Sequence, residues 1–356
     1  MCSSDLLPGN MALTAAFAGS RGYNLIVVTE GNPTIARVPT GNTCSPNAPF
    51  QSDLNGPKCW TGNEPRTNPL RTVNGQPLGW DNIELRTASS NSLYNSLQVG
   101  LQKRLSYGLQ LQGSYTFSKA FDETQGQLIG DSSVGPPDPT NIKLDRAPAG
   151  FDVNQNMTFN AIYKIPALVD AGSRMGVLLN GWMASGIVSL RSGFPVNARL
   201  GTNRSLSRTL SGTFGGTTDR PNLVAGRNAD NISSGTSAGC GTGPTAIAAG
   251  TPLGTVERFY DPCAFTLPTA GFLGDAQRNP MRGPGQATLD ISLSKDAGLS
   301  ALGEQGRLEF RSDFFNILNR ANFSNPNESV DSAIAGQITA TRTKPRQIQL
   351  SLRLSF

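Results

Sequence analysis

Hydrophobic and polar residues alternate one by one along seven segments of the chain, which is the pattern of β-strands with one apolar and one polar face. The clearest segment runs from Leu93 to Leu105, where only Lys103 interrupts the apolar row. The seven apolar rows are Leu97, Val99, Leu101 and Leu105; Leu109, Leu111, Tyr115 and Phe117; Met157, Phe159, Ala161, Tyr163 and Ile165; Trp182, Ala184, Gly186, Val188 and Leu190; Ala287, Leu289, Ile291 and Leu293; Leu308, Phe310 and Phe314; and Ile348, Leu350, Leu352, Leu354 and Phe356. A weaker eighth strand is predicted from Asn10 to Ala18.

The links between the predicted strands alternate between short and long. The short links lie at 106–108, 166–176 and 297–306, and the long ones at 19–92, 121–155, 199–286 and 319–346. Successive links of an antiparallel sheet fall at opposite ends, so all the short links share one end. A membrane β-barrel has this asymmetry, with short periplasmic turns and long outer loops, whereas a soluble β-sandwich does not sort its links by length. The pattern predicts an all-β, antiparallel transmembrane β-barrel segment with a periplasmic carboxyl terminus.

Composition agrees with this fold class. Charged residues make up only 15% of the chain, while Gly reaches 40 and Pro 24, which favours strands and turns over helices. No run of eighteen or more apolar residues occurs, so a transmembrane helix is excluded as the membrane element.

The chemistry available to the chain is narrow. It has no His, which removes the usual general base and the commonest metal ligand. We therefore expect no enzyme, no cofactor and no metal site. The net charge is +5, but Lys and Arg are scattered singly, so nucleic-acid binding is not expected. The carboxylates Asp131, Asp138, Asp145 and Asp152 do not match an EF-hand spacing, and we expect them to be solvated loop residues.

Four of the five cysteines lie in two of the long links, Cys44 near Cys59 and Cys240 near Cys263. Each pair closes a short loop inside a long segment, whereas a cross pairing has to bring two links together at a larger cost in chain entropy. We predict the two disulfides Cys44–Cys59 and Cys240–Cys263, with Cys2 free. Disulfides indicate an oxidising location.

The amino-terminal sequence MCSSDLLPGN has neither a basic start nor an apolar stretch of the length of an export signal. For an exported barrel, we therefore expect Met1 to be an internal start.

Several segments resemble Oar-like TonB-dependent receptors, a group with large outer-membrane barrels. The similar segments are LPGNMALTAAFAGSRGYNLI, NSLYNSLQVGLQKRLSYGLQLQGSYTFSKAFDE, FDVNQNMTFNAIYKIP, LNGWMASGIVSLRSGFPV, DRPNLV, FYDPCAFTLPTAGFLGDAQRNPMRGPG, LDISLSK, GRLEFRSDFFNILNRANFSNPN and PRQIQLSLRLSF. They follow one another in the order of that group's carboxy-terminal half.

The resemblance implies a barrel of about 22 strands around a folded plug, energised through TonB. Residues 1–356 then form an incomplete receptor β-barrel domain, without the plug and amino-terminal domains, and contact with TonB is made only through the missing region. About eight strands of so large a wall have the wrong curvature to close, so we expect an open, curved sheet whose first and last strands do not pair.

The last strand also resembles the signal that is read by the outer-membrane assembly machinery. Its alternating residues end in a carboxy-terminal aromatic residue. The residues of this assembly signal are Ile348, Leu350, Leu352, Leu354 and Phe356.

One strand carries three charges on its polar side, which in a barrel faces the lumen: Glu309, Arg311 and Asp313. Such charges either line a solute path or hold the wall to a plug or to each other, and the second interpretation is favoured.

These observations predict a cell outer-membrane protein that is part of a receptor for a scarce solute, such as a siderophore, an oligosaccharide or a peptide. Its expected partners are outer-membrane lipid, lipopolysaccharide and the barrel assembly machinery. Two alternatives stay open: a surface or adhesion barrel that transports nothing, and a soluble carbohydrate-binding β-sandwich.

Overall fold

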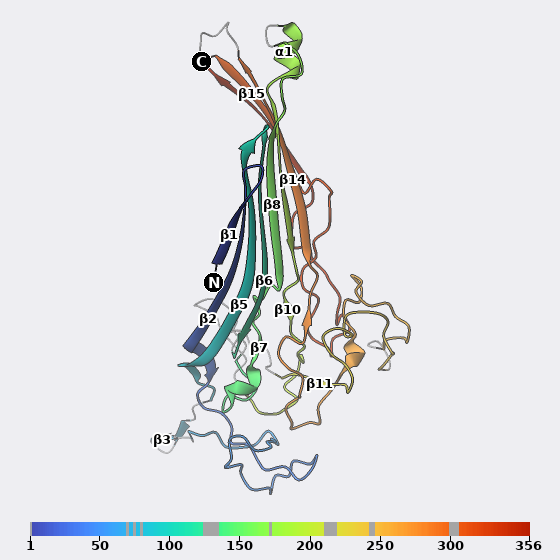
Figure 1. Ribbon diagram of the computed structural model, residues 1–356. Helices are drawn as coiled ribbons and strands as arrows, with labels where there is room; N and C mark the ends of the chain where they lie inside the picture. Colours follow the sequence, from blue (N-terminus) through green and yellow to red (C-terminus); the bar gives the residue numbers. More distant parts are fainter. Residues whose placement is uncertain are drawn as a thin grey trace.

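The computed structural model is a tall, curved antiparallel sheet with long links gathered at one end (Figure 1). It describes residues 2–68, 71–73, 76–78, 81–123, 135–170, 173–209, 219–241, 246–298 and 306–356, without the side chains of residues 2–7, 71–73, 76–78 and Arg174. The nine strands of the wall are β1 (Cys2–Leu7), β2 (Met11–Glu30), β5 (Glu84–Ser106), β6 (Leu109–Asp122), β8 (Gln155–Lys164), β9 (Trp182–Arg191), β14 (Gln286–Gly298), β15 (Arg307–Phe315) and β16 (Gln347–Ser355).

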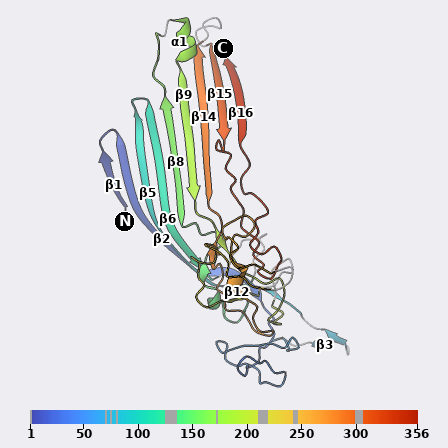
Figure 2. The same ribbon diagram turned by 90° about the vertical axis from the view of Figure 1, so that its right-hand side faces the viewer.

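The wall is open. Its strands are hydrogen-bonded in the order in which they follow one another along the chain, from β1 at one edge to β16 at the other (Figure 2). Over the described residues, β1 pairs with β2 alone and β16 with β15 alone. The prediction of an open antiparallel sheet is confirmed, with nine strands in the wall instead of about eight. The strand expected from Asn10 to Ala18 is longer and extends to Glu30.

The apolar rows of neighbouring strands lie side by side. In the register of β2, β5 and β6, Phe17 lies opposite Leu97, and Leu97 lies opposite Phe117. All three side chains are exposed. Ser96 and Ser118, on the other face of the same strands, are buried. The apolar face therefore points outward, and the polar face is the inner face of the wall.

The short links share one end of the wall, called here the turn end; they are residues 8–10, 107–108, 165–181 and 299–306. The tightest is Tyr107–Gly108, where both residues have positive φ, as the two-residue turns that match the twist of a hairpin require. A Cβ on Gly108 would come within 2.6 Å of the Lys164 carbonyl oxygen. The third link holds a short helix that the sequence did not predict, α1 (Arg174–Leu179). No helix in the described part of the chain has the length and apolar character to cross a membrane.

The long links meet at the other end, called here the loop end. They are link 1 (residues 31–83), link 2 (123–154), link 3 (192–285) and link 4 (316–346). Their regular elements are short: β3 (Arg71–Val73), β4 (Gln76–Leu78), η1 (Ile142–Asp145), β7 (Ala147–Pro148), β10 (Pro195–Val196), β11 (Asn222–Leu223), η3 (Pro262–Ala264), β12 (Phe265–Thr266) and β13 (Met281–Arg282). Together the described residues of the four links form the loop body. Its apolar core is Val196, Ala198, Ile232, Tyr260, Ala264, Phe265, Ala276 and Met281.

Candidate functional site

The outer face of the wall carries an apolar band bounded by lysines. Lys103 lies opposite Leu111 of β6 near the turn end, and Lys119 of β6 lies opposite Asn95 toward the loop end. Leu111 and Lys119 are eight positions apart. At ~3.3 Å per residue this is about 26 Å along the strand, or roughly 20 Å of height at the usual tilt. Since lysine side chains extend toward the polar interface, the spacing fits the hydrocarbon layer of a membrane.

The inner face near the turn end is charged. Glu309 lies opposite Asp296 on one side and Arg353 on the other. Around them is a shallow hollow of about 700 Å³, lined by Asp296, Gly298, Gly306, Arg307, Glu309, Arg353 and Ser355. Arg311 donates from Nε to both carboxylate oxygens of Asp313, at 2.9 and 3.0 Å. The predicted lumen-facing charges therefore share one face of β15, and two of them hold each other.

Buried ion pairs tie the loop body to the wall. Arg278 of link 3, almost fully buried, contacts the carboxylate of Asp122 at the end of β6 and donates from Nε to the Asp145 carbonyl oxygen at 3.0 Å. Arg220 pairs with the Asp145 carboxylate, and Arg282 pairs with Asp152. Each carboxylate therefore has a cationic partner from link 3. These pairs fix link 2 against the loop end of β6.

These contacts correct one expectation. Asp138, Asp145 and Asp152 are buried, and each is paired with a cation, Asp138 with Lys58. The expectation that they are solvated was wrong. Each carboxylate is buried against a cation that lies far away in the sequence, so the local sequence does not reveal the pairing. Asp131 lies outside the described residues. Within the described ranges, no three His, Cys, Asp or Glu side chains gather in a group that could hold a metal ion.

Two disulfides brace the loop body. Cys44 is bonded to Cys59, with Cα atoms 5.7 Å apart, and Cys240 to Cys263, with Cα atoms 5.5 Å apart. The pairing is the one expected from the sequence; the side chain of Cys2 is not among those described. Cys240–Cys263 joins a bend of link 3 to the residue before Ala264 of the apolar core.

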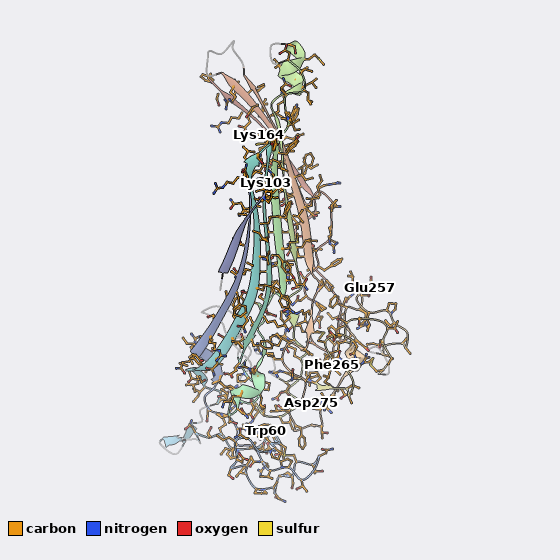
Figure 3. All side chains as sticks on the ribbon, in the orientation of Figure 1. Trp60, Lys103, Lys164, Glu257, Phe265 and Asp275 are labelled. Carbon is orange, nitrogen blue, oxygen red and sulfur yellow. A yellow bond between two sulfur atoms is a disulfide. The ribbon has the colours of Figure 1, made fainter. Side chains whose placement is uncertain are left out.

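Contacts between links make the loop body one unit. Trp60 of link 1 donates its backbone N–H to the Gly271 carbonyl of link 3 at 2.8 Å. Tyr260 of link 3 donates from its hydroxyl to the Asn327 carbonyl of link 4 at 2.8 Å. In Figure 3, Trp60 and Phe265 lie in this body, far from Lys103 and Lys164 at the turn end of the wall. Sequence periodicity gave no signal for these contacts, because irregular links are held by single bonds and not by repeating ladders.

Glu64 of link 1 is a buried carboxylate held by four hydrogen bonds. It accepts hydrogen bonds from Arg37 Nε at 2.9 Å, from the backbone N–H and hydroxyl of Thr61 at 2.9 and 2.6 Å, and from the Gly62 N–H at 2.9 Å. Burial alone would raise the pKa of Glu64, but the bonds from Thr61 and Arg37 outweigh it and lower the pKa below its usual value.

Four residues of the predicted assembly signal share the outward face of β16, and Phe356 directly follows the strand. Leu350 lies opposite Ser312, and Leu352 opposite Phe310, in the ladder with β15. All five side chains of the signal are exposed: Ile348, Leu350, Leu352, Leu354 and Phe356. Their role in assembly stays a prediction.

Comparison with known proteins gives a family and one similar solved structure. The profile of a family described as an outer membrane beta barrel domain matches residues 5–349. Among solved structures, the chain is similar to the crystal structure of the outer membrane transporter YddB from Escherichia coli, with a TM-score of 0.45 and 9% sequence identity. The match covers 99% of this chain and 31% of that one, so the chain spans about a third of the transporter's length. No curated protein matches.

Proposed function

Because the chain belongs to the outer membrane beta barrel domain family and lies in the bacterial outer membrane, we propose that it is part of the wall of a TonB-dependent receptor. The receptor takes up a scarce solute, such as a siderophore, an oligosaccharide or a peptide, and carries out no chemical step on it. The family assignment rules out the alternative of a soluble carbohydrate-binding β-sandwich.

The open wall is the observation that carries this proposal. The outer edges of β1 and β16 leave a row of backbone N–H and C=O groups without partners from the described strands. Hydrocarbon does not tolerate unpaired backbone groups, so further strands have to complete the wall in the membrane. The lumen of a barrel widens with the number of its strands, and outer-membrane transporters of about 22 strands hold a plug in theirs.

The same geometry supports an orientation of the wall in the membrane. Short turns are periplasmic in outer-membrane barrels and long loops are external, so the loop body lies outside the cell. The band between Lys103 and Lys119 then contacts lipid and lipopolysaccharide, the barrel assembly machinery reads the β16 strand, and contact with TonB is made through an amino-terminal region.

A second candidate is an adhesion barrel, in which the loop body binds a surface partner and nothing is transported. It is favoured by exposed apolar side chains on link 2, where Leu144 and Phe151 are 65% and 67% exposed. Apolar side chains at loop tips are common in surfaces that bind other proteins.

Uptake assays in cells distinguish the two. Cells that make the complete protein are given a ferric siderophore, an oligosaccharide or a peptide, each radiolabelled, with and without an uncoupler that collapses the proton-motive force. A TonB-dependent receptor accumulates one of these solutes only in energised cells, and a strain without TonB accumulates none. If binding to cells is unaffected by the uncoupler and no solute is accumulated, the receptor proposal is wrong and adhesion is favoured.

A further inference from the structure

Two arginines rest on one aromatic ring at the loop end of the wall. The guanidinium carbon of Arg191 lies 5.1 Å from the centre of the Phe194 ring, and that of Arg342 lies 4.6 Å from it. Arg191 is the last residue of β9, and Arg342 comes from link 4. Each contact of a cation with a ring stabilises the pair but neutralises no charge.

Both arginines lack an acidic partner. Elsewhere in the loop body, the buried Arg220 and Arg278 and the partly buried Arg282 are paired with carboxylates. Within the part of the chain that the structure describes, no carboxylate lies within ion-pair distance of Arg191 or Arg342. Partial burial and the charge of Arg191 lower the pKa of Arg342. Two like charges held together in this way stabilise an anion placed between them.

Hydrogen bonding leaves the same place incomplete. The Nε of Arg191 and the Oε1 of Gln286 are buried and have no partner among the described residues. These two residues face each other in the ladder of β9 and β14, and Asn156 of β8 lies on the other side of Arg191. Arg342 has one side-chain bond, from Nη2 to Asn325 Oδ1 at 3.3 Å, which leaves most of its donors available.

The position of Arg342 is fixed by the backbone. Its N–H donates to the Asn322 carbonyl at 2.7 Å, and the Asn322 side chain in turn accepts from the N–H of Ala287 at 2.8 Å. Asn322 is fully buried, so link 4 is fastened to the first residues of β14. The backbone of Arg342 is thus held beside β14, and its guanidinium group rests on the Phe194 ring before any ligand arrives, which reduces the entropy cost of binding.

The cluster faces the lumen. Leu190, the neighbour of Arg191, belongs to the outward apolar row, and alternation puts Arg191 on the inner face. Lipid phosphates therefore do not reach it, whereas a solute that enters the barrel from the loop end does. Arginine binds carboxylates and phosphates through two parallel hydrogen bonds, which Lys does not reproduce.

We propose that Arg191 and Arg342, held on Phe194, bind an anionic group, a carboxylate or a phosphate, of the solute that the barrel admits. Since this assignment rests on the proposed uptake function, binding is measured on the purified complete protein, where no energy source is needed.

Calorimetric titration with citrate and with inorganic pyrophosphate tests the site, and the neutral sugar raffinose serves as the uncharged probe. We expect one or both anions to bind and raffinose not to bind. Arg191→Gln and Arg342→Gln should each weaken anion binding at least tenfold, and Arg342→Lys should weaken it less. The matched control is Arg307→Gln, which removes the same charge from the inner face at the turn end of the wall and should leave binding unchanged.

A measurement on the unaltered protein covers variants that fail to fold. Phenylglyoxal modifies arginines, and pyrophosphate or citrate should protect Arg191 and Arg342, but not Arg307, as located by peptide mapping. The proposed site is refuted if neither anion binds, if protection maps to other arginines, or if Arg307→Gln weakens binding as much as Arg191→Gln. Anion binding without energy-dependent uptake would refute the receptor function and leave the anion site standing. Energy-dependent uptake that is unchanged in Arg191→Gln would refute the anion site and leave the receptor function standing.

Discussion

Arg37 donates a hydrogen bond from Nε to Oε1 of Glu64 over 2.9 Å, and the Cys44–Cys59 disulfide is nested between these two residues in the sequence. The backbone N–H of Arg37 also donates to the carbonyl of Cys59 at 2.8 Å. A side-chain pair, a backbone bond and a covalent bond therefore close the same segment of link 1. The stability of this segment should depend on pH and on redox state separately.

The pH dependence follows from Glu64. Its folded pKa is lowered below the usual 4.5, so its bonds stabilise link 1 above pH 4.5, and this stability is lost as the pH falls through the folded pKa. At pH 7, Glu64→Gln should cost about 1.5–3 kcal/mol of local stability, as expected for hydrogen bonds to a charged group. Hydrogen exchange of link 1 at pH 7 and at pH 3 measures this.

The exposed Glu257 of link 3 supplies the control, since Glu257→Gln removes a carboxylate charge from the surface of the loop body. An equal loss of local stability in Glu64→Gln at both pH values would show that the shape of the side chain, and not its charge, stabilises link 1.

Substitutions on the outer face should depend on depth. Val99 lies midway between Lys103 and Asn95 on β5, whereas Leu101 is closer to the turn end. Val99→Arg should destabilise the barrel by about 2–4 kcal/mol, and Leu101→Arg by less, because the cost of a charge falls toward the interface. Unfolding by urea in liposomes gives both values. Gln98→Arg, on the inner face, is the control, and an equal cost there would contradict the assignment of faces.

Removing the first disulfide should loosen the loop body and spare the wall. The Cys44→Ser, Cys59→Ser double variant opens a bridge across 15 residues, which corresponds to about 3 kcal/mol of chain entropy. Limited proteolysis should then cut link 1 faster. The wall should keep the migration of a folded barrel when unheated samples are run on gels. Loss of that migration would mean that the loop body is required for the barrel itself.

Phe356→Ala should slow assembly without weakening the assembled barrel. Phe356 is 88% exposed and follows the end of β16, so it adds little to packing within the described residues. We expect a several-fold lower insertion rate by the barrel assembly machinery and an unchanged urea midpoint. Leu318→Ala, which changes an apolar residue of link 4 that is 71% exposed, is the control. Equal insertion rates for Phe356→Ala and the unaltered protein would remove the assembly role.

The wall could be predicted from the sequence because each strand repeats one alternation over many residues. Two parts of the wall were not predicted, because the alternation is absent or interrupted there. The segment Cys2–Leu7 is too short and too polar to show the pattern, and it is recognised as β1 only through its pairing with Met11–Ala16. The half of β2 nearer the loop end contains an irregularity between Gly22 and Leu25, which breaks the alternation before the strand continues to Glu30.

The loop body could not be predicted beyond its disulfides. The cysteine pairing follows from short separations along the chain, whereas the ion pairs join distant residues, such as Arg278 with Asp122 and Arg220 with Asp145. Nothing in the local sequence of Asp145 distinguishes a buried carboxylate from a solvated one. The Arg191 and Arg342 pair is equally hidden, because the two residues lie on β9 and on link 4 and meet only on the folded Phe194 ring.

The strands of the wall differ greatly in length. Past the level of Lys119, β5 continues from Asn95 to Glu84, about 36 Å further at ~3.3 Å per residue, and β2 accompanies it to Glu30. On the other side, β9 already ends at Arg191. The strands of the wall are therefore staggered at the loop end: β2 and β5 continue as a two-stranded ribbon beyond the level at which β9 ends. If the loop body lies outside the cell, as proposed, this ribbon stands clear of the hydrocarbon layer on one flank of the wall only.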